Sequence, residues 1–455
     1  MPGIYLGGGV SGPAFAEPED CVLVLGPPRT GKTTSIVIPN VLMASGPVVV
    51  TSTKPDVLSA TWYERSRRGA CLLFDPSGSL SGPVPPIGWS PLQSSRTYDG
   101  AVLMAKTMVD IARPGVTSDS LHWNERAMAL LGPLFHAAAA DGRSMRDLLG
   151  WVDLREAAHA KRILAGVDAE LASRSLRGIL LSEEREQSGI WSTAASVLAG
   201  FRTESALRLT EGPLLDAEAF VAAGSAGWSP TLYVCASGAR HQQAAPLVAG
   251  LLSDVRDATY RLNALSPTGR GRPATLFVLD ELANIAPLPD LPHIVAEGGG
   301  QGLITLACLQ DMSQARSRWP GSGAGFLSQF GTKVILPGIA DIQTLQAIST
   351  MIGDRHVEQT STTRRRGRAG GVRRQGSSTT SSTRREPIMP PSAVREGLAG
   401  LALTLTRGGK ASWVRMTPYL YRSHAEPSRM SPHAHQRVSP SPPRASSRPR
   451  LLRPR

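Results

Sequence analysis

The sequence feature that most constrains the fold is a glycine-rich loop placed directly after a short apolar run. Residues 21–25 (CVLVL) have the composition of a buried parallel strand, and the pattern G-x-x-x-x-G-K-[ST] follows at once. The loop comprises Gly26, Pro27, Pro28, Arg29, Thr30, Gly31, Lys32, Thr33 and Thr34. Loops of this kind surround phosphate oxygens with backbone N–H groups, while the lysine reaches the β- and γ-phosphates and the hydroxyl ligates Mg²⁺. We therefore expect ATP and Mg²⁺ as ligands, Lys32 as a catalytic residue and Thr33 as a metal ligand.

A pair of adjacent carboxylates supplies the partner that this loop needs. The apolar run 273–279 (PATLFVL) ends in Asp280 and Glu281. In phosphoryl transfer, one such acid holds the Mg²⁺ shell and the other takes a proton from the attacking water. We assign the first role to Asp280 and the second to Glu281. A solvated turn is the alternative interpretation of two acids after a strand, and the complete phosphate loop argues against it.

A polar residue also ends a third apolar run. Residues 303–309 (LITLACL) lead to Gln310. Polar side chains at the carboxyl ends of parallel strands face the ligand edge of an α/β sheet. Gln310 is thus a candidate catalytic residue that senses the γ-phosphate or the attacking water, with an ordinary strand-end residue as the alternative.

Strands and helices alternate along most of the chain, which is typical of an α/β fold with a mostly parallel sheet. Four further strands are expected at 47–51, 71–74, 231–235 and 332–336. Between residues 99 and 208 the apolar residues recur at helical spacing, without a strand signal. The helical segments expected there are 101–111, 124–140, 145–152, 157–164, 171–181 and 190–201. We interpret them as an all-α subdomain inserted into one nucleotide-binding domain.

This organisation predicts the following domain boundaries. Residues 1–112 form the first part of the nucleotide-binding domain, and residues 113–210 form the all-α subdomain. Residues 211–421 complete the nucleotide-binding domain, and a basic tail occupies residues 422–455.

The net charge of +13 is concentrated in two arginine-rich segments. Residues 359–386 and 422–455 each hold eight arginines and one acid, so the rest of the chain carries a formal charge of −1. Both segments are poor in large apolar residues, and burial therefore cannot offset the entropy lost on ordering them. We expect a disordered insertion and a disordered tail, which act either as solvated linkers or as transient phosphate-binding segments.

Cysteine spacing argues against a disulfide-stabilised secreted protein, and hydropathy argues against a transmembrane helix. The four cysteines have neither metal-ligand spacing nor the pattern of a disulfide framework, which favours an intracellular, reducing setting. No apolar run reaches the roughly 18 residues of a transmembrane helix, and the N-terminus lacks the features of a signal peptide.

Several stretches resemble, in a consistent order, the TraG/TraD group of type IV secretion coupling proteins. The stretches are Gly26–Thr34 followed by Ile38-Pro39-Asn40, Thr51–Asp56 (TSTKPD), Phe74-Asp75-Pro76, Trp89–Leu92 (WSPL), His122–Glu125 (HWNE), Leu279–Asn284 (LDELAN), Leu309-Gln310 with Ser313-Gln314, Thr332–Val334 and Thr344–Gly353. Each piece alone is weak, but the ordered set covers most of residues 19–420 and is specific.

The resemblance implies a RecA-like motor domain that carries an all-helical lobe. Members of the group hydrolyse ATP, assemble as hexamers at the inner membrane and deliver relaxase-bound single-stranded DNA or protein to the secretion channel. We therefore expect single-stranded DNA, relaxase and relaxosome proteins, and type IV secretion channel components as partners of a homo-hexamer. The expected location is the cytoplasm or the cytoplasmic face of the plasma membrane.

The chain departs from the family pattern in three places. Members usually carry two N-terminal transmembrane helices, whereas this chain starts where the motor domain starts, as a soluble paralogue or a version without its anchor. The arginine that the family commonly places before the glutamine is absent from residues 297–302 (EGGGQG), which leaves Arg316, Arg318 and Arg355 as candidates to reach a neighbouring subunit's nucleotide. Thr53 stands where an aspartate is common.

Two other functions share part of this pattern. An FtsK-like DNA translocase has the same motor but normally adds a C-terminal winged-helix module, and the sequence after residue 420 is an Arg/Ser/Pro-rich tail. A nucleotide-binding adaptor without motor activity would bind substrate proteins through the helical lobe, and the missing arginine and anchor favour it slightly. DNA-stimulated ATP turnover distinguishes a motor from an adaptor.

Overall fold

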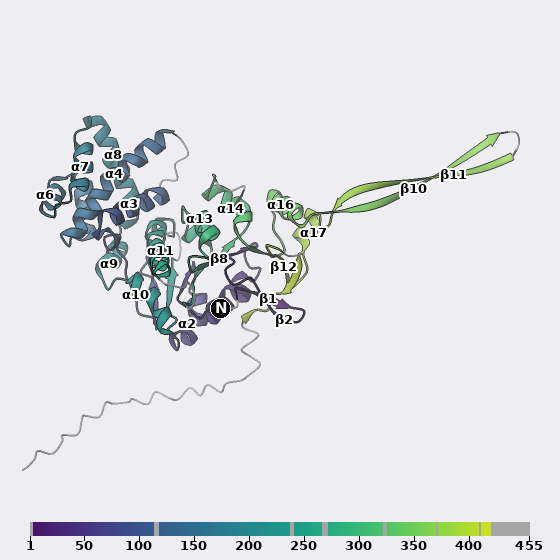
Figure 1. Cartoon of the computed structure of the whole chain (residues 1–455), viewed down its shortest axis with the longest axis horizontal. Coiled ribbons are helices and arrows are strands. Elements are labelled where there is room, and N and C mark those ends of the chain that lie inside the picture. Colours follow the sequence, from purple (N-terminus) through teal and green to yellow (C-terminus); the bar gives the residue numbers. More distant parts are fainter. Residues whose placement is uncertain are drawn as a thin grey trace, which may run out of the picture.

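In the computed structural model of the chain, seven parallel strands form the larger part of a mixed sheet within the described residues (Figure 1). The structure describes residues 3–112, 118–236, 241–265, 272–321, 325–369, 372–408 and 411–419. In spatial order the parallel strands are β9 (Thr332–Ile335), β3 (Val22–Leu25), β8 (Leu303–Leu309), β7 (Thr275–Leu279), β4 (Val48–Ser52), β6 (Thr231–Cys235) and β5 (Cys71–Phe74). They match the seven apolar runs of the sequence, and the expected α/β fold class is confirmed.

Four antiparallel strands, which the sequence does not predict, extend the described sheet beyond β9. They are β12 (Leu401–Leu405), β13 (Ser412–Arg415), β1 (Tyr5–Gly9) and β2 (Gly12–Phe15). The side chain of Asn40 fixes β1, because its amide oxygen accepts from Tyr5 N (2.8 Å) and its amide nitrogen donates to Tyr5 O (2.9 Å). This buried contact explains why an asparagine lies within α1 (Ile38–Met43), the helix that follows the phosphate loop.

The two faces of the sheet belong to separate apolar cores. Along β3, Val22 and Val24 pack on one face, whereas Leu23 and Leu25 pack on the other. This alternation follows from the two-residue period of a strand. The helices around the sheet are α1 (Ile38–Met43), which follows the π-helical turn η1 (Thr33–Val37), α2 (Asp56–Ser66), α10 (Ala217–Ala222) with the turn η4 (Ala223–Ala226), α11 (His241–Ala264), α12 (Leu282–Ile285), α13 (Leu291–Glu297), α14 (Met312–Arg318), α15 (Phe326–Gln329), α16 (Ile342–Ile352) and α17 (Pro391–Glu396).

A lobe of helices lies beside the sheet (Figure 1). Its elements are the turn η2 (Ser94–Arg96), α3 (Tyr98–Ala112), α4 (Ser118–Ala140), α5 (Met145–Asp153), α6 (Ala158–Gly166), α7 (Glu170–Leu180), α8 (Glu184–Val197), the turn η3 (Leu198–Phe201) and α9 (Glu204–Glu211). The lobe and one face of the sheet share a continuous apolar core, which includes Phe135 of the lobe and Phe277 of β7. The proposed division into domains remains a prediction.

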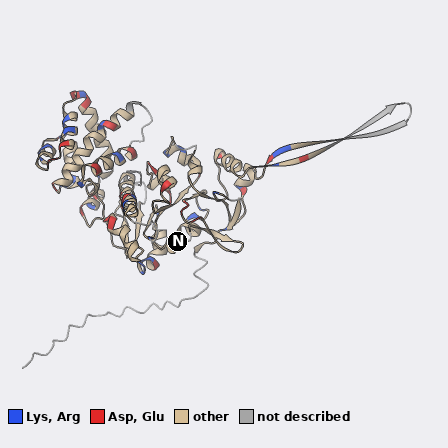
Figure 2. Cartoon of the chain, in the orientation of Figure 1, with Lys and Arg blue, Asp and Glu red and all other residues tan. Residues whose placement is uncertain are grey.

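Charge and hydropathy of the described part of the chain agree with a near-neutral body. Figure 2 shows acidic and basic residues interspersed over the described helices. None of these helices combines the length and the apolarity that a membrane crossing requires. The four cysteines are buried and free, and the described residues contain no group of three or more acidic, His or Cys side chains suited to a metal ion.

The arginine-rich insertion differs from the expectation of disorder. Strands β10 (Asp354–Ala369) and β11 (Val372–Pro387) pair in antiparallel fashion along their whole length and project from the body as a ribbon (Figure 1). The composition argument considers only burial of a core, whereas a hairpin satisfies its backbone groups by pairing with itself, and Ser/Thr-rich strands accommodate this. The predicted disordered tail, residues 422–455, lies outside the described residues.

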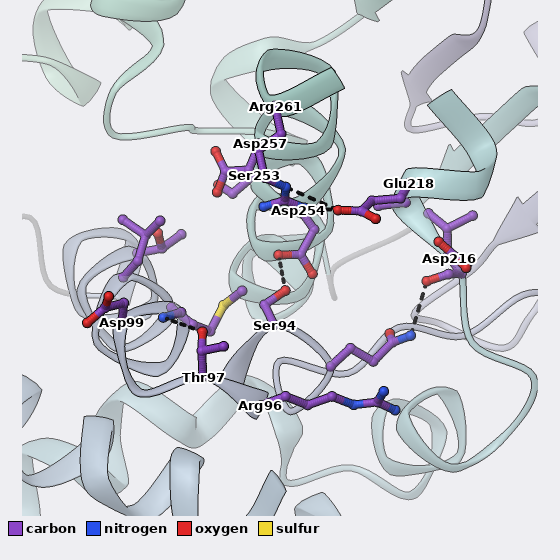
Figure 3. Close-up of a pocket in the computed structure, with 17 residues that line it drawn as sticks. Ser94, Arg96, Thr97, Asp99, Asp216, Glu218, Ser253, Asp254, Asp257 and Arg261 are labelled. Carbon is purple, nitrogen blue, oxygen red and sulfur yellow. Dashed lines mark hydrogen bonds and ion pairs between the residues drawn. The ribbon is translucent and has the colours of Figure 1, made fainter. Parts of the chain in front are cut away.

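A buried tryptophan connects the start of the lobe to α11. Trp89 is 1% exposed, and its Nε1 donates to Asp254 Oδ2 (2.7 Å). Ser94 Oγ donates to the other oxygen of the same carboxylate. Asp254 lies at the edge of a polar cleft of about 620 Å³ between α3, α10 and α11, shown in Figure 3. Gly250, one helical turn before Asp254, lets the indole approach the helix.

We expect Gly250→Ala to destabilise the fold by about 1–3 kcal/mol or more, because overpacked cores respond on this scale. A Cβ at this position would lie 2.2 Å from the Trp89 ring and 2.5 Å from Met108 Cε. Gly178→Ala in α7 is the matched control, because a Cβ there meets nothing within 4 Å and alanine favours the helix by about 0.5–1 kcal/mol. The urea concentration at the unfolding midpoint should fall for Gly250→Ala and rise for Gly178→Ala. Equal shifts of the two midpoints would contradict this packing.

Asp254 should make stability depend on pH in a defined direction. Burial raises the pKa of its carboxyl from 3.8 to about 6, although the bonds from Ser94 and Trp89 partly oppose the shift. The native state therefore binds more protons than the unfolded state between about pH 4 and 6, and this contribution weakens the fold as pH rises. Relative to the wild type, Asp254→Asn should gain stability across this window. If the free energies of unfolding of the wild type and of Asp254→Asn changed with pH in parallel, the pKa of the Asp254 carboxyl would not be raised in the folded state.

Candidate nucleotide-binding site

The phosphate loop connects β3 to η1 in a tightly wrapped conformation. Gly31 has a φ of +89°, in the region that favours glycine. At Gly26 a Cβ would lie 2.9 Å from the Cβ of Leu336, so a larger residue would displace the loop from β9. Within the loop, Thr30 Oγ1 donates to Pro27 O (2.8 Å). The two glycines of the motif therefore meet different requirements, one of conformation and one of space.

The side chain of Lys32 folds back onto its own loop. Lys32 is buried at 7% exposure, and its Nζ donates to Gly26 O (2.5 Å) and Pro27 O (3.0 Å). The ammonium group is thus held inside the loop by carbonyl oxygens.

Thr33 and Asp280 meet directly, as their expected shared role requires. Thr33 Oγ1 donates to Asp280 Oδ2 at 2.9 Å. Burial raises the pKa of Asp280 to about 6, against the effect of the Thr33 hydrogen bond. A hydroxyl and a carboxylate are the oxygen ligands that Mg²⁺ prefers. The donor set therefore fits Mg²⁺.

Glu281 occupies an unusual backbone position at the end of β7. Its φ of 55° places it in the left-handed region, immediately before α12. Asn284 Nδ2 donates to Glu281 Oε2 (3.2 Å), and Thr51 Oγ1 donates to the backbone oxygen of Asp280 (3.1 Å). Strained conformations of this kind occur at functional sites that the surrounding structure holds in place. These contacts orient the carboxylate that the sequence singles out as a base.

A cleft of about 550 Å³ brings most of the predicted site residues together. Its lining consists of Pro28, Arg29, Thr30, Gly31, Lys32, Thr33, Thr34, Ser52, Thr53, Lys54, Asp56, Asp280 and Glu281. The side chains of Lys54 and Asp56 are functional candidates that motif reasoning did not select. The signal for them was present, because the TSTKPD stretch runs from the end of strand β4 into the loop that follows it, and loops at the carboxyl ends of parallel strands form ligand sites.

Gln310 lies at the expected strand end but does not line this cleft. It follows β8, whose last carbonyl, that of Leu309, accepts a hydrogen bond from Gly26 N (3.2 Å). The backbone N–H of Gln310 donates to Gln314 Oε1 (2.8 Å). The residue before Gln310 in the chain therefore contacts the start of the phosphate loop, and the role of Gln310 as a sensor remains a prediction.

Two of the three candidate arginines have partners within the same chain. Arg316 pairs with Asp341 (2.8 Å), and Arg318 Nε donates to Ala283 O (3.0 Å). Arg318 thereby connects α14 to the helix that follows the acidic pair. Arg355 is exposed at the start of β10.

Comparisons with known proteins find similarity to proteins named for conjugal transfer. Residues 274–397 match the family described as "TraM recognition site of TraD and TraG". Two curated proteins from Escherichia coli, both named "Conjugal transfer protein TraG", are 26% and 24% identical to this chain. These matches cover 70% and 66% of this chain, but 53% and 50% of the relatives. The chain thus spans about half the length of the curated relatives it matches.

Solved structures of the coupling protein TrwB share the fold. An unbound form of "Bacterial conjugative coupling protein TrwBdeltaN70" is 20% identical, with a TM-score of 0.67, and the match covers 90% of this chain and 89% of that chain. TrwB "in complex with ADP and Mg2+" is 19% identical, with a TM-score of 0.66 and coverages of 88% and 85%. TrwB with a "non-hydrolisable ATP-analogue" is also 19% identical, with a TM-score of 0.65 and coverages of 92% and 89%.

The family match lies over the acidic pair and the strands beside it, and the TraG matches extend over most of the chain. Together with the TrwB-like fold, these findings confirm the resemblance that the ordered motifs indicate. The chain is therefore similar to TraG/TraD-type conjugative coupling proteins over most of its length.

Proposed function

We propose that this chain is an ATP-hydrolysing coupling protein, which recruits single-stranded DNA with its relaxase and pumps it toward a type IV secretion channel. The observation that carries the proposal is the cleft in which Lys32 and Thr33 of the phosphate loop meet Asp280 and Glu281. Such a combination of a phosphate cradle, a metal-binding pair and a base is what phosphoryl transfer to water requires.

Nucleotide binding would begin with an exchange of hydrogen bonds in the loop. Lys32 gives up the carbonyls of Gly26 and Pro27 and takes the β- and γ-phosphate oxygens of ATP instead. The loop N–H groups surround the phosphates, and Arg29 and Lys54 add positive charge to the wall of the cleft. TrwB structures named for ADP and for an ATP analogue support a nucleotide at this loop.

Hydrolysis would use the acidic pair in two roles. Thr33 and Asp280 are the residues that would hold Mg²⁺, which neutralises charge developing on the phosphates. The carboxylate of Glu281 accepts a proton from the attacking water. Because Asn284 bonds to Oε2, the second carboxylate oxygen of Glu281 remains available to the water.

The partners are proposed from the family rather than from the cleft. The description "TraM recognition site" supports a relaxosome protein as a partner of residues 274–397. We extend the proposal to a homo-hexamer at the cytoplasmic face of the plasma membrane, in contact with the relaxase and with secretion channel components. The helical lobe is the proposed site of cargo selection.

Two alternatives give different results in one assay. An FtsK-like translocase would couple ATP turnover to double-stranded DNA, whereas a coupling protein should respond to single strands. A nucleotide-binding adaptor would bind ATP without any DNA-stimulated turnover.

The cleft makes different predictions for its lysine and its glutamate. Lys32→Ala should abolish both nucleotide binding and hydrolysis, because it removes the main phosphate ligand. Glu281→Gln should still bind nucleotide but lower kcat by about 100-fold or more, because it removes the general base. Binding of a fluorescent ATP analogue and phosphate release measure the two properties.

Lys161→Ala is the control for this experiment, because Lys161 is exposed on α6 of the lobe. It should retain both binding and turnover. Unchanged ATPase rates in the Lys32 and Glu281 variants would exclude the proposed function.

A further inference from the structure

The β10–β11 ribbon is set apart from the rest of the fold. The register pairs every position from Asp354 with Pro387 to Ala369 with Val372, and neither strand joins the large sheet. At about 3.3 Å per residue, strands of 16 residues extend about 50 Å. Figure 1 shows the ribbon extending away from the body beyond α16 and α17. A structure of this shape offers its surface to a partner and not to the core of its own chain.

The register concentrates arginine positions near the end of the ribbon. Arg364, Arg365, Arg366, Arg368, Arg373 and Arg374 fall within five successive residue pairs. Positions 368 and 373 are directly opposite each other, and like charges in such cross-strand positions destabilise a hairpin. A polyanionic partner would turn this repulsion into attraction. The near-neutral body offers no comparable concentration of charge in the sequence.

The composition of the ribbon favours one class of polyanion. Residues 354–387 contain no Phe, Tyr or Trp, so they lack the aromatic platforms on which single-stranded bases stack. All basic residues in this range except His356 are arginines, whose planar group binds phosphates and guanine edges through paired hydrogen bonds. A two-stranded ribbon also fits the major groove of duplex DNA, which is about 12 Å wide.

We propose that the β10–β11 ribbon is an arm that binds double-stranded DNA. The arm holds duplex DNA through phosphate and groove contacts, at a site separate from the nucleotide cleft. DNA binding by the arm is a function beyond the proposed ATPase activity, because it needs neither ATP nor an intact Glu281. In a transfer reaction, such an arm would hold the duplex from which a single strand is drawn.

The test compares two triple variants of the full chain without nucleotide. The ribbon variant carries Arg364→Ser, Arg366→Ser and Arg368→Ser, and the tail variant carries Arg444→Ser, Arg448→Ser and Arg450→Ser. The tail is the matched control, because residues 422–455 hold the same number of arginines and acids as residues 359–386. Affinity for a DNA duplex and for one of its single strands is measured between about 50 and 200 mM salt.

The ribbon variant should lose the preference for duplex over single strand. For the duplex, the slope of log K against log salt concentration should also become less steep by about 2 to 3, because each lost phosphate contact removes about 0.9 from the slope. The tail variant should keep the preference for duplex, and its affinities for the duplex and for the single strand should fall by the same factor. Replacing the same three ribbon arginines with lysine should restore most of the salt slope, since charge is retained.

Basal ATPase activity of both serine variants should equal that of the wild type, which separates this proposal from the proposed function of the cleft. Equal losses in the ribbon and tail variants would overturn the proposal in favour of charge alone. Unchanged duplex binding by the ribbon variant would also overturn it. The same holds if, in a parallel assay, the ribbon variant loses binding to vesicles of anionic phospholipid but keeps its affinity for the duplex.

Discussion

The hydrogen bond between Thr33 and Asp280 joins two residues that are 247 positions apart in the chain. It depends on the order of the parallel strands, in which β8 separates β3 from β7. Because all three strands run in the same direction, their carboxyl ends meet at one edge, and the phosphate loop and the acidic pair lie across the end of β8. An exchange of β7 with a strand farther from β3, such as β6, would separate the two halves of the site, even if every local motif were kept.

A set of short contacts then holds the end of β7 in place. Thr51 at the end of β4 bonds to the backbone of Asp280, and Arg318 of α14 bonds to the backbone of Ala283. The left-handed residue Glu281 lies between these two anchors, and Asn284 fixes its side chain. Since α14 follows β8 and Gln310, these contacts connect the carboxyl ends of β4, β7 and β8.

The parts of the fold that could be predicted are those with a local cause. Each parallel strand is a short apolar run, and the phosphate loop has a fixed spacing, so both are visible in the sequence. Strand β1 (YLGGG) has no such pattern, because the Asn40 side chain and pairing with β13 hold it. The pairing of β10 with β11 could not be predicted, because composition measures the capacity for burial and not the capacity of a chain to pair with itself. Lys54 was missed because its proximity to the loop arises from strand order.

The account is tested most directly by a crystal structure of the chain with Mg²⁺ and a non-hydrolysable ATP analogue. We predict that the phosphates occupy the loop, that Lys32 Nζ leaves the carbonyls of Gly26 and Pro27 for phosphate oxygens, and that Mg²⁺ lies beside Thr33 and Asp280. The Thr33 hydroxyl would ligate the metal through its oxygen and could still donate its hydrogen to Asp280. An analogue bound outside this cleft would contradict the account. So would one bound in the loop while Lys32 Nζ stays on the carbonyls of Gly26 and Pro27.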